Sequence, residues 1–127
     1  MVKLLIIGLF GGIGSVLRYL VSGWCQGLSN GSFPVGTLVV NVVGCLLIGV
    51  LGALFFGPFL IRDEYRMALM VGLLGGFTTF SSFGWETLTL ANNGQLGLAL
   101  ANIVLSNVLG LAAAWAGYRL GVRLFGV

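Results

Sequence analysis

The stretch GGFTTFSSF, residues 75–83, places glycines and hydroxyl residues in the middle of a strongly apolar segment. Phe77, Phe80 and Phe83 recur within it at intervals of three. A glycine pair followed by Thr-Thr favours a break in a helix, while an unbroken helix with a glycine notch for packing is the alternative. In a membrane, irregular backbone is tolerated only where it is buried in protein or lines a cavity. The fold therefore depends on whether this segment crosses a membrane.

The composition indicates an integral membrane protein. Of the 127 residues, 58% are hydrophobic and only 7% are charged. Soluble domains carry about 25% charged residues, so this chain has too few charges to cover a surface that faces water. A formal charge of +3 without a basic cluster also argues against a nucleic-acid-binding protein.

Four apolar segments are long enough to cross a bilayer, which requires about 20 residues per helix. They are residues 3–23, 35–57, 66–91 and 97–122. Both prolines and the Asn-Gly turn sequences lie between them. We therefore expect one all-α membrane domain over residues 1–127 with four transmembrane helices, the third of which is broken in mid-membrane.

The basic residues predict how the helices are oriented. With four spans, the two ends of the chain and the middle loop share one side of the membrane. That side holds every basic residue except Arg18, namely Lys3, Arg62, Arg66, Arg119 and Arg123. Because cytoplasmic loops carry an excess of Lys and Arg, we expect a multi-pass protein of the plasma membrane with both termini in the cytoplasm.

Glycine pairs spaced by four residues indicate close helix packing. The pairs are Gly8/Gly12, Gly72/Gly76 and Gly117/Gly121. In lipid, small residues drive association because they let two backbones approach closely. We expect these pairs to pack helices within or between subunits.

Polar residues recur on one face of several predicted helices. They are Thr37, Asn41 and Cys45 on the second; Thr79, Ser82, Glu86, Thr89 and Asn93 on the third; and Asn102 and Ser106, with Asn107 adjacent, on the fourth. A single hydroxyl can bond to a carbonyl of its own helix, but stripes on separate helices indicate a wetted path. Polar groups within a membrane usually face protein or water.

The kind of solute follows from the chemistry of these groups. Hydroxyls and the Asn41 amide are neutral donors, and with Arg18 nearby they suit an anion better than a cation. Glu86 argues the other way, unless it is neutral or only orients its neighbours. Arg18 could instead extend to the lipid headgroups. The chain has no His and only three acidic residues, so we do not expect an enzyme that uses acid–base chemistry.

These residues resemble the Fluc (CrcB) family of fluoride channels. The matching stretches are GGIGSVLRY (11–19), GTLVVNVVG (36–44) and GLLGGFTTFSSFGWE (72–86), in the order and at the spacing of the family. The resemblance implies a fluoride-selective passive channel that exports cytoplasmic fluoride. It also implies an antiparallel dimer with two pores, formed with a second copy or with a paralogous chain of opposite topology.

The resemblance assigns roles to individual residues. Phe80 and Phe83 match the pore rings whose edges face fluoride, Asn41 matches the pore asparagine, and Arg18 matches the vestibule arginine. Further polar positions along the path are Thr37, Ser81, Ser82 and Glu86.

The same resemblance implies a structural sodium ion at the centre of the dimer. The backbone carbonyls of Gly75 and Thr78 match those that hold it.

The fourth predicted helix departs from the family pattern. Its stretch LGLAAAWAG (109–117) lacks the late hydroxyls that members of the family can carry. Either Asn102, Ser106 and Asn107 replace them, or this part of the pore differs from that of the family. Two other functions stay open. A small proton-coupled multidrug exporter would need a carboxylate in the first helix, which has Arg18 and no acid. The other is a non-conducting partner subunit of a heterodimeric channel.

Overall fold

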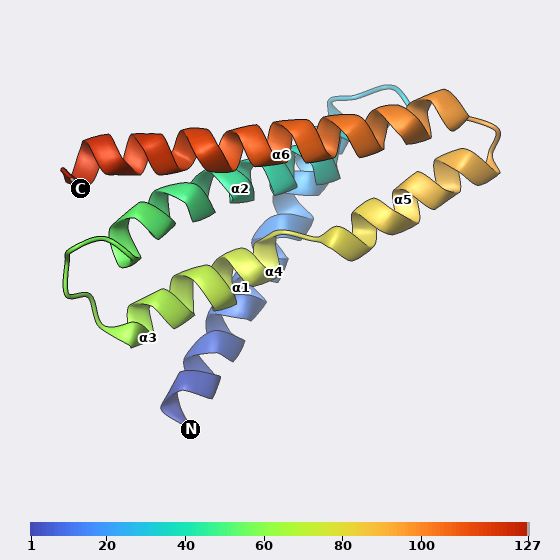
Figure 1. The fold of residues 1–127 in the computed structure, drawn as a ribbon. Coiled ribbons are helices and arrows are strands. Elements are labelled where there is room, and N and C mark those ends of the chain that lie inside the picture. Colours follow the sequence, from blue (N-terminus) through green and yellow to red (C-terminus); the bar gives the residue numbers. More distant parts are fainter. Residues whose placement is uncertain (127) are drawn as a thin grey trace.

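The protein is all-helical over residues 1–126, which the computed structural model describes, and no strand occurs in that range. Val127, the last residue of the expected domain, lies outside the described residues. The elements are α1 (Val2–Gly27), α2 (Val35–Phe55), α3 (Asp63–Arg66), the π-helix η1 (Met67–Leu73), α4 (Leu74–Phe77), α5 (Phe80–Asn92) and α6 (Leu96–Phe125) (Figure 1).

The prediction of four spans is confirmed as far as length and composition decide it. Four helical stretches are long and apolar enough to cross a membrane: Val2–Gly27, Val35–Phe55, Asp63–Asn92 and Leu96–Phe125. The first and last continue beyond the predicted ends at 23 and 122, because an apolar count marks only the part of a helix that suits hydrocarbon. The second ends two residues before the predicted end at 57, ahead of Pro58.

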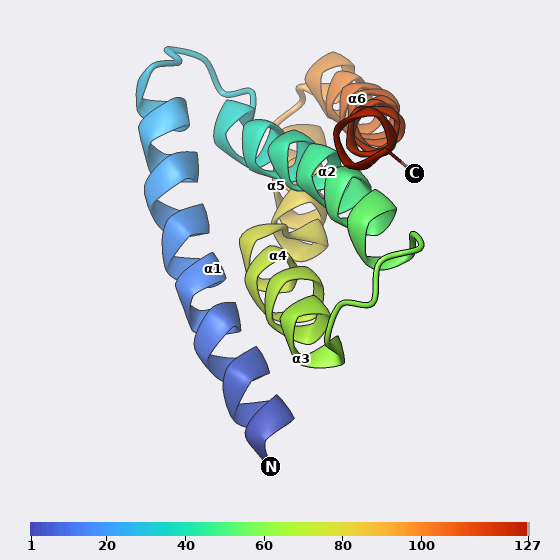
Figure 2. The same cartoon turned by 90° about the vertical axis from the view of Figure 1, so that its left-hand side faces the viewer.

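The helices pack as two groups that meet along α2. Figure 1 shows α2 and α6 side by side, and the contact between them is the most extensive in the molecule. The first helix packs instead on η1 and α4. In Figure 2, α2 lies between α1 and α6. The segment that contains residues 75–83 therefore lies against both α1 and α2, through α4.

Two of the three predicted glycine pairs pack helices within the chain. A Cβ on Gly117 would collide with the Leu46 carbonyl of α2, and one on Gly76 would collide with the Gly11 carbonyl of α1. Gly8 and Gly12 differ, because a Cβ there would meet no atom of residues 1–126 within 4 Å. Whether that pair packs between subunits stays a prediction.

The exposed surface suits a lipid environment. Side chains such as Leu5, Trp85 and Leu111 point outward and are about 70% exposed (70%, 68% and 73%). Among the large side chains of the described residues, only Val40 and Asn102 are fully buried. A molecule with such a small core depends on close backbone packing and on a surrounding apolar phase.

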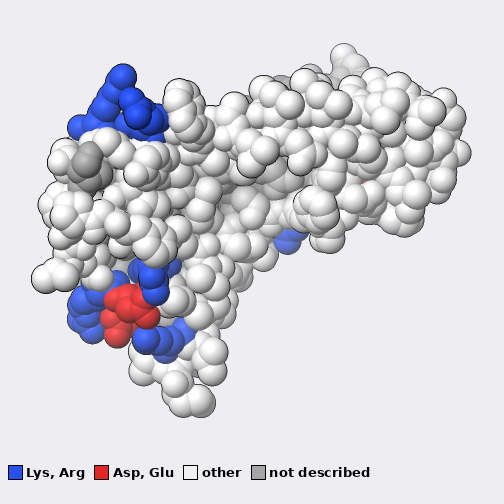
Figure 3. Space-filling model, in the orientation of Figure 1, with Lys and Arg blue, Asp and Glu red and all other residues white. Residues whose placement is uncertain are grey.

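Basic side chains gather at the end of the molecule where both termini lie, and one basic patch lies apart from it (Figure 3). At that end, Lys3 Nζ lies 3.0 Å from Asp63 Oδ2, which joins the beginning of α1 to α3. Asp63 also pairs with Arg66.

Candidate functional site

The segment between α4 and α5 leaves the helical conformation at two residues. Thr78 has φ −83° and ψ 157°, and Thr79 has φ −151° and ψ 114°, so both are extended. Threonine suits this conformation because its β-branched side chain favours extended backbone. Gly75 and Gly76 lie inside α4 and keep φ below zero. The threonines thus make the interruption, whereas the sequence had suggested that the glycine pair shares in it.

Asn41 of α2 holds the interruption through two hydrogen bonds to one residue. Its Nδ2 donates to the carbonyl of Thr79 at 2.9 Å, and its Oδ1 accepts from the Thr79 N–H at 2.8 Å. In an unbroken helix that N–H would donate to the carbonyl of Gly75. The amide of Asn41 therefore replaces the lost helical partner and keeps one N–H hydrogen for another acceptor.

The side chain of Thr79 caps α5. Its Oγ1 accepts from the Ser82 N–H at 3.1 Å and donates to Ser82 Oγ at 3.0 Å. A hydroxyl capping the first turn in this way satisfies a donor that has no partner within the helix. Because Ser82 Oγ accepts here, its own hydrogen stays available to a solute.

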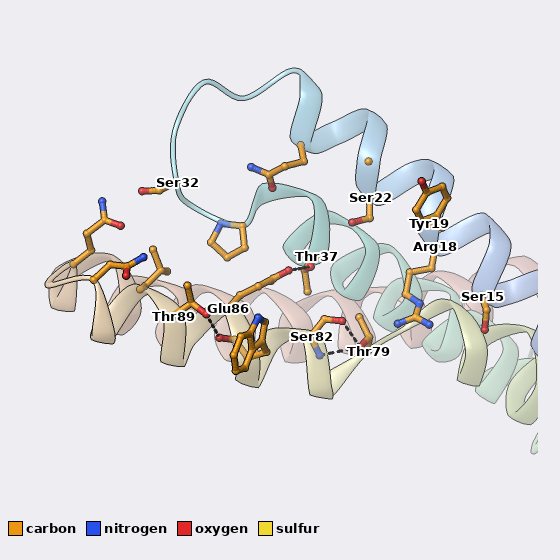
Figure 4. Close-up of a pocket in the computed structure, with 17 residues that line it drawn as sticks. Ser15, Arg18, Tyr19, Ser22, Ser32, Thr37, Thr79, Ser82, Glu86 and Thr89 are labelled. Atoms are coloured by element: carbon orange, nitrogen blue, oxygen red, sulfur yellow. Dashed lines mark hydrogen bonds between the residues drawn. The ribbon is translucent and has the colours of Figure 1, made fainter.

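Two cavities adjoin at Thr79, which lines both of them. The first, of about 690 Å³, lies between α1, α2 and α5 (Figure 4). Among the predicted site residues, it is lined by Arg18, Thr37, Ser82 and Glu86. The second, of about 350 Å³, is lined by Asn41, Gly75, Thr78, Phe80 and Phe83. Ser81 is the one predicted site residue that lines neither cavity. Its side chain is exposed, although its Oγ lies 3.3 Å from Thr79 Oγ1.

The predicted polar stripe of the third segment runs along the first cavity. All five of its members line that cavity: Thr79, Ser82, Glu86, Thr89 and Asn93. Four polar residues of α1 that sequence reasoning missed line the same cavity beside Arg18: Ser15, Tyr19, Ser22 and Gln26. Their spacing of three or four residues was a usable signal, since it puts them on one face of a helix.

Glu86 and Thr37 form a pair across the first cavity (Figure 4). Thr37 Oγ1 donates to Glu86 Oε1 at 2.8 Å. The other oxygen, Oε2, is buried and has no hydrogen-bond partner within residues 1–126. A buried polar atom without a protein partner usually bonds to water or an ion. In the described part of the chain, the guanidinium of Arg18 forms no ion pair with this carboxyl group.

The two phenylalanines that the family resemblance assigns to the pore lie beside each other on α5. The ring centroids of Phe80 and Phe83 are 5.3 Å apart and the planes are tilted by 43°. Phe80 is 81% exposed in the single chain. One wall of the second cavity therefore lies on the outer surface of the single chain.

The fourth helix contributes two residues to the second cavity. Ser106 and Asn107 line it, whereas Asn102 is only 1% exposed and lies behind the lining. The Asn107 amide donates to the carbonyl of Ile103 in its own helix at 2.7 Å.

Comparison with known proteins identifies the family. Residues 5–118 match the family model described as CrcB-like protein, Camphor Resistance (CrcB). The fluoride-specific ion channel FluC of Agrobacterium fabrum is 45% identical over 125 residues, covering 98% of this chain and 100% of the relative. Its namesake from Thermus thermophilus is 46% identical over 124 residues, covering 98% and 97%. That from Solibacter usitatus is 45% identical over 121 residues, covering 95% and 99%. The chain therefore belongs to the CrcB family.

Proposed function

We propose that this protein is a fluoride-selective channel through which fluoride leaves the cytoplasm passively. The relatives named as fluoride-specific ion channels support the choice of ion. The observation that carries the proposal is that two cavities sharing Thr79 are lined by polar side chains and aromatic rings from α1, α2, α5 and α6. A channel of this kind catalyses no reaction.

Fluoride must exchange its water for protein donors, because an unsolvated ion is very costly to bury. Among the predicted site residues, three groups have hydrogens to offer: the guanidinium of Arg18, the hydroxyl of Ser82 and the second amide hydrogen of Asn41. The positive edges of the Phe80 and Phe83 rings add weak attraction. We infer that Arg18 attracts the ion into the first cavity and that Ser82 and Asn41 replace its hydration on either side of Thr79.

The interruption offers a site that fits a structural sodium ion. The Thr79 N–H donates to Asn41 and not to the Gly75 carbonyl, which relieves that oxygen of its helical donor. Thr78 is extended, so its carbonyl leaves the direction of the helix axis. Neutral carbonyl oxygens are suitable ligands for a hard alkali cation. We propose that Gly75 and Thr78 hold Na⁺, which would supply a fixed positive charge.

The second half of the proposal concerns assembly and orientation. Gly75 and Phe80 are exposed in the single chain although both line the second cavity. A second subunit would cover them, and we propose an antiparallel dimer with another copy or with a paralogous chain. Five of six basic residues lie on the side of both termini, which supports termini in the cytoplasm. A membrane potential that is negative inside then drives the anion outward.

Efflux from liposomes tests the function. The purified chain is reconstituted, a potassium gradient sets the voltage, and fluoride and chloride release are measured separately. We expect fluoride release without chloride release, and we expect Phe80→Ile to abolish it. Phe59→Ile is the matched control, because Phe59 lies in the loop between α2 and α3 and lines neither cavity. Chloride release equal to fluoride release would refute selectivity.

A preparation that releases no fluoride calls for a second experiment with a partner chain. If well-folded protein releases nothing, a paralogue with the opposite charge bias is co-expressed and the pair is reconstituted. Release by the pair would identify this chain as one half of a heterodimer. Silence of the pair as well would refute the proposed function.

A further inference from the structure

Three polar side chains connect the second cavity to the interior of the molecule. Asn102 Nδ2 donates to Thr87 Oγ1 at 2.9 Å, and Ser106 Oγ donates to Asn102 Oδ1 at 3.1 Å. Thr87 Oγ1 in turn donates to the carbonyl of Phe83 at 2.7 Å. This relay joins α6 to α5 and ends at two residues that line the cavity, Ser106 and Phe83.

The last acceptor of the relay, the Phe83 carbonyl, determines the direction of every hydrogen in it. The Phe83 carbonyl can only accept, so the single hydrogen of Thr87 must point to it. Thr87 can then only accept from Asn102, which turns Nδ2 toward Thr87 and Oδ1 toward Ser106. An amide oxygen can only accept, so the single hydrogen of Ser106 points inward. Ser106 therefore presents lone pairs, and no donor, to the second cavity.

We propose that Asn102 is a positioning residue that withholds the Ser106 hydrogen from the permeating anion. The inference rests on the proposed conduction of fluoride. A channel must bind its ion weakly enough to release it, and hydrogen bonds to an ion are about twice as strong as neutral ones. By keeping the hydroxyl donor of Ser106 occupied, the relay removes a tight binding site beside Phe83.

The predicted effect has a sign that structural damage would not produce. Asn102→Leu removes the acceptor of the Ser106 hydrogen at nearly constant side-chain volume. We expect the released hydroxyl to donate to fluoride. The fluoride concentration that half-saturates efflux should then fall about tenfold, and the maximal rate should fall as well. Mere damage to packing would lower the rate without tightening the apparent affinity.

A double-mutant cycle decides whether Asn102 acts through Ser106. Wild type, Asn102→Leu, Ser106→Ala and the double variant are compared for half-saturation and maximal rate. In the Ser106→Ala background, Asn102→Leu should no longer shift half-saturation, because no hydroxyl remains to release. An equal shift in both backgrounds, or no shift in either, would overturn the inference. Asn92→Leu is the matched control, because Asn92 is exposed at the end of α5 and lines neither cavity, and its effect should not depend on Ser106.

A second variant tests the same relay in case the first does not fold. If Asn102→Leu does not fold, Thr87→Val takes its place, since it removes the hydroxyl that fixes the orientation of the Asn102 amide. It should shift half-saturation in the same direction, and only when Ser106 is present; a shift independent of Ser106 would overturn the inference. A wild-type preparation that releases no fluoride, alone or with its paralogue, would remove the proposed function and this inference together.

Discussion

Replacing Asn41 with leucine removes both hydrogen bonds that hold the extended residue Thr79. Thr79 is only 8% exposed, so water cannot readily replace the lost partner of its N–H, and an unpaired buried donor costs about 1–3 kcal/mol. Its carbonyl keeps the first helical bond of α5, so the second loss costs about 0.5–1.5 kcal/mol. We therefore expect Asn41→Leu to lower the free energy of unfolding by about 1.5–4.5 kcal/mol.

Unfolding in mixed detergent micelles, followed by tryptophan fluorescence, measures this difference. The matched variant is Asn107→Leu, the same chemical change at an exposed residue whose amide bonds a carbonyl of its own helix. Such a surface change should alter stability by no more than about 0.5 kcal/mol. Hydrogen exchange at the Thr79 amide gives a local readout and should accelerate only in Asn41→Leu. Equal stability of the two variants, with unchanged exchange at Thr79, would refute the role of Asn41 as a clamp.

Three further predictions concern packing, sodium and orientation. Gly117→Ala should destabilise the fold by about 1–3 kcal/mol, because its Cβ would collide with the Leu46 carbonyl. A Cβ at Gly97 in the same helix would meet open space, so Gly97→Ala should not destabilise the fold. Equal detergent-unfolding curves for the two variants would contradict close packing of Gly117 on α2. If the carbonyls at the interruption hold sodium, purification with a large organic cation in place of Na⁺ should lower resistance to detergent unfolding, and unchanged resistance would count against the site. A reporter fused to the C-terminus should be found mainly in the cytoplasm, whereas equal signals from both sides of the membrane would argue against a fixed orientation.

The sequence was sufficient for the features that depend on periodicity. Apolar length located the four spans, and spacings of three and four residues put Thr79 and Glu86 on one face, which the structure shows along the first cavity. Local composition suggested an interruption in this segment but gave the glycine pair a share in it, whereas the extended residues are Thr78 and Thr79. These features depend on one helix at a time, and for that reason a single sequence carries them.

Features that depend on which atoms meet across helices could not be predicted. Periodicity gives the face of Asn41 but not its two bonds to Thr79. Ser81 was assigned to the path by the family resemblance and not by periodicity, and the structure leaves that residue exposed. Nor does periodicity show that Asn102 turns a hydroxyl away from a cavity, because the direction of a hydrogen depends on every acceptor around it.

The extended pair at Thr78 and Thr79 also has an electrostatic consequence. Peptide dipoles add along a helix and leave the equivalent of about half an elementary charge at each end, positive at the N-terminus and negative at the C-terminus. By stopping one helix at Phe77 and starting another at Phe80, the chain brings a negative helix end and a positive helix end to adjacent points within the span. Two residues of extended backbone thereby give the middle of this span local fields of both signs, although residues 67–85 contain no charged side chain.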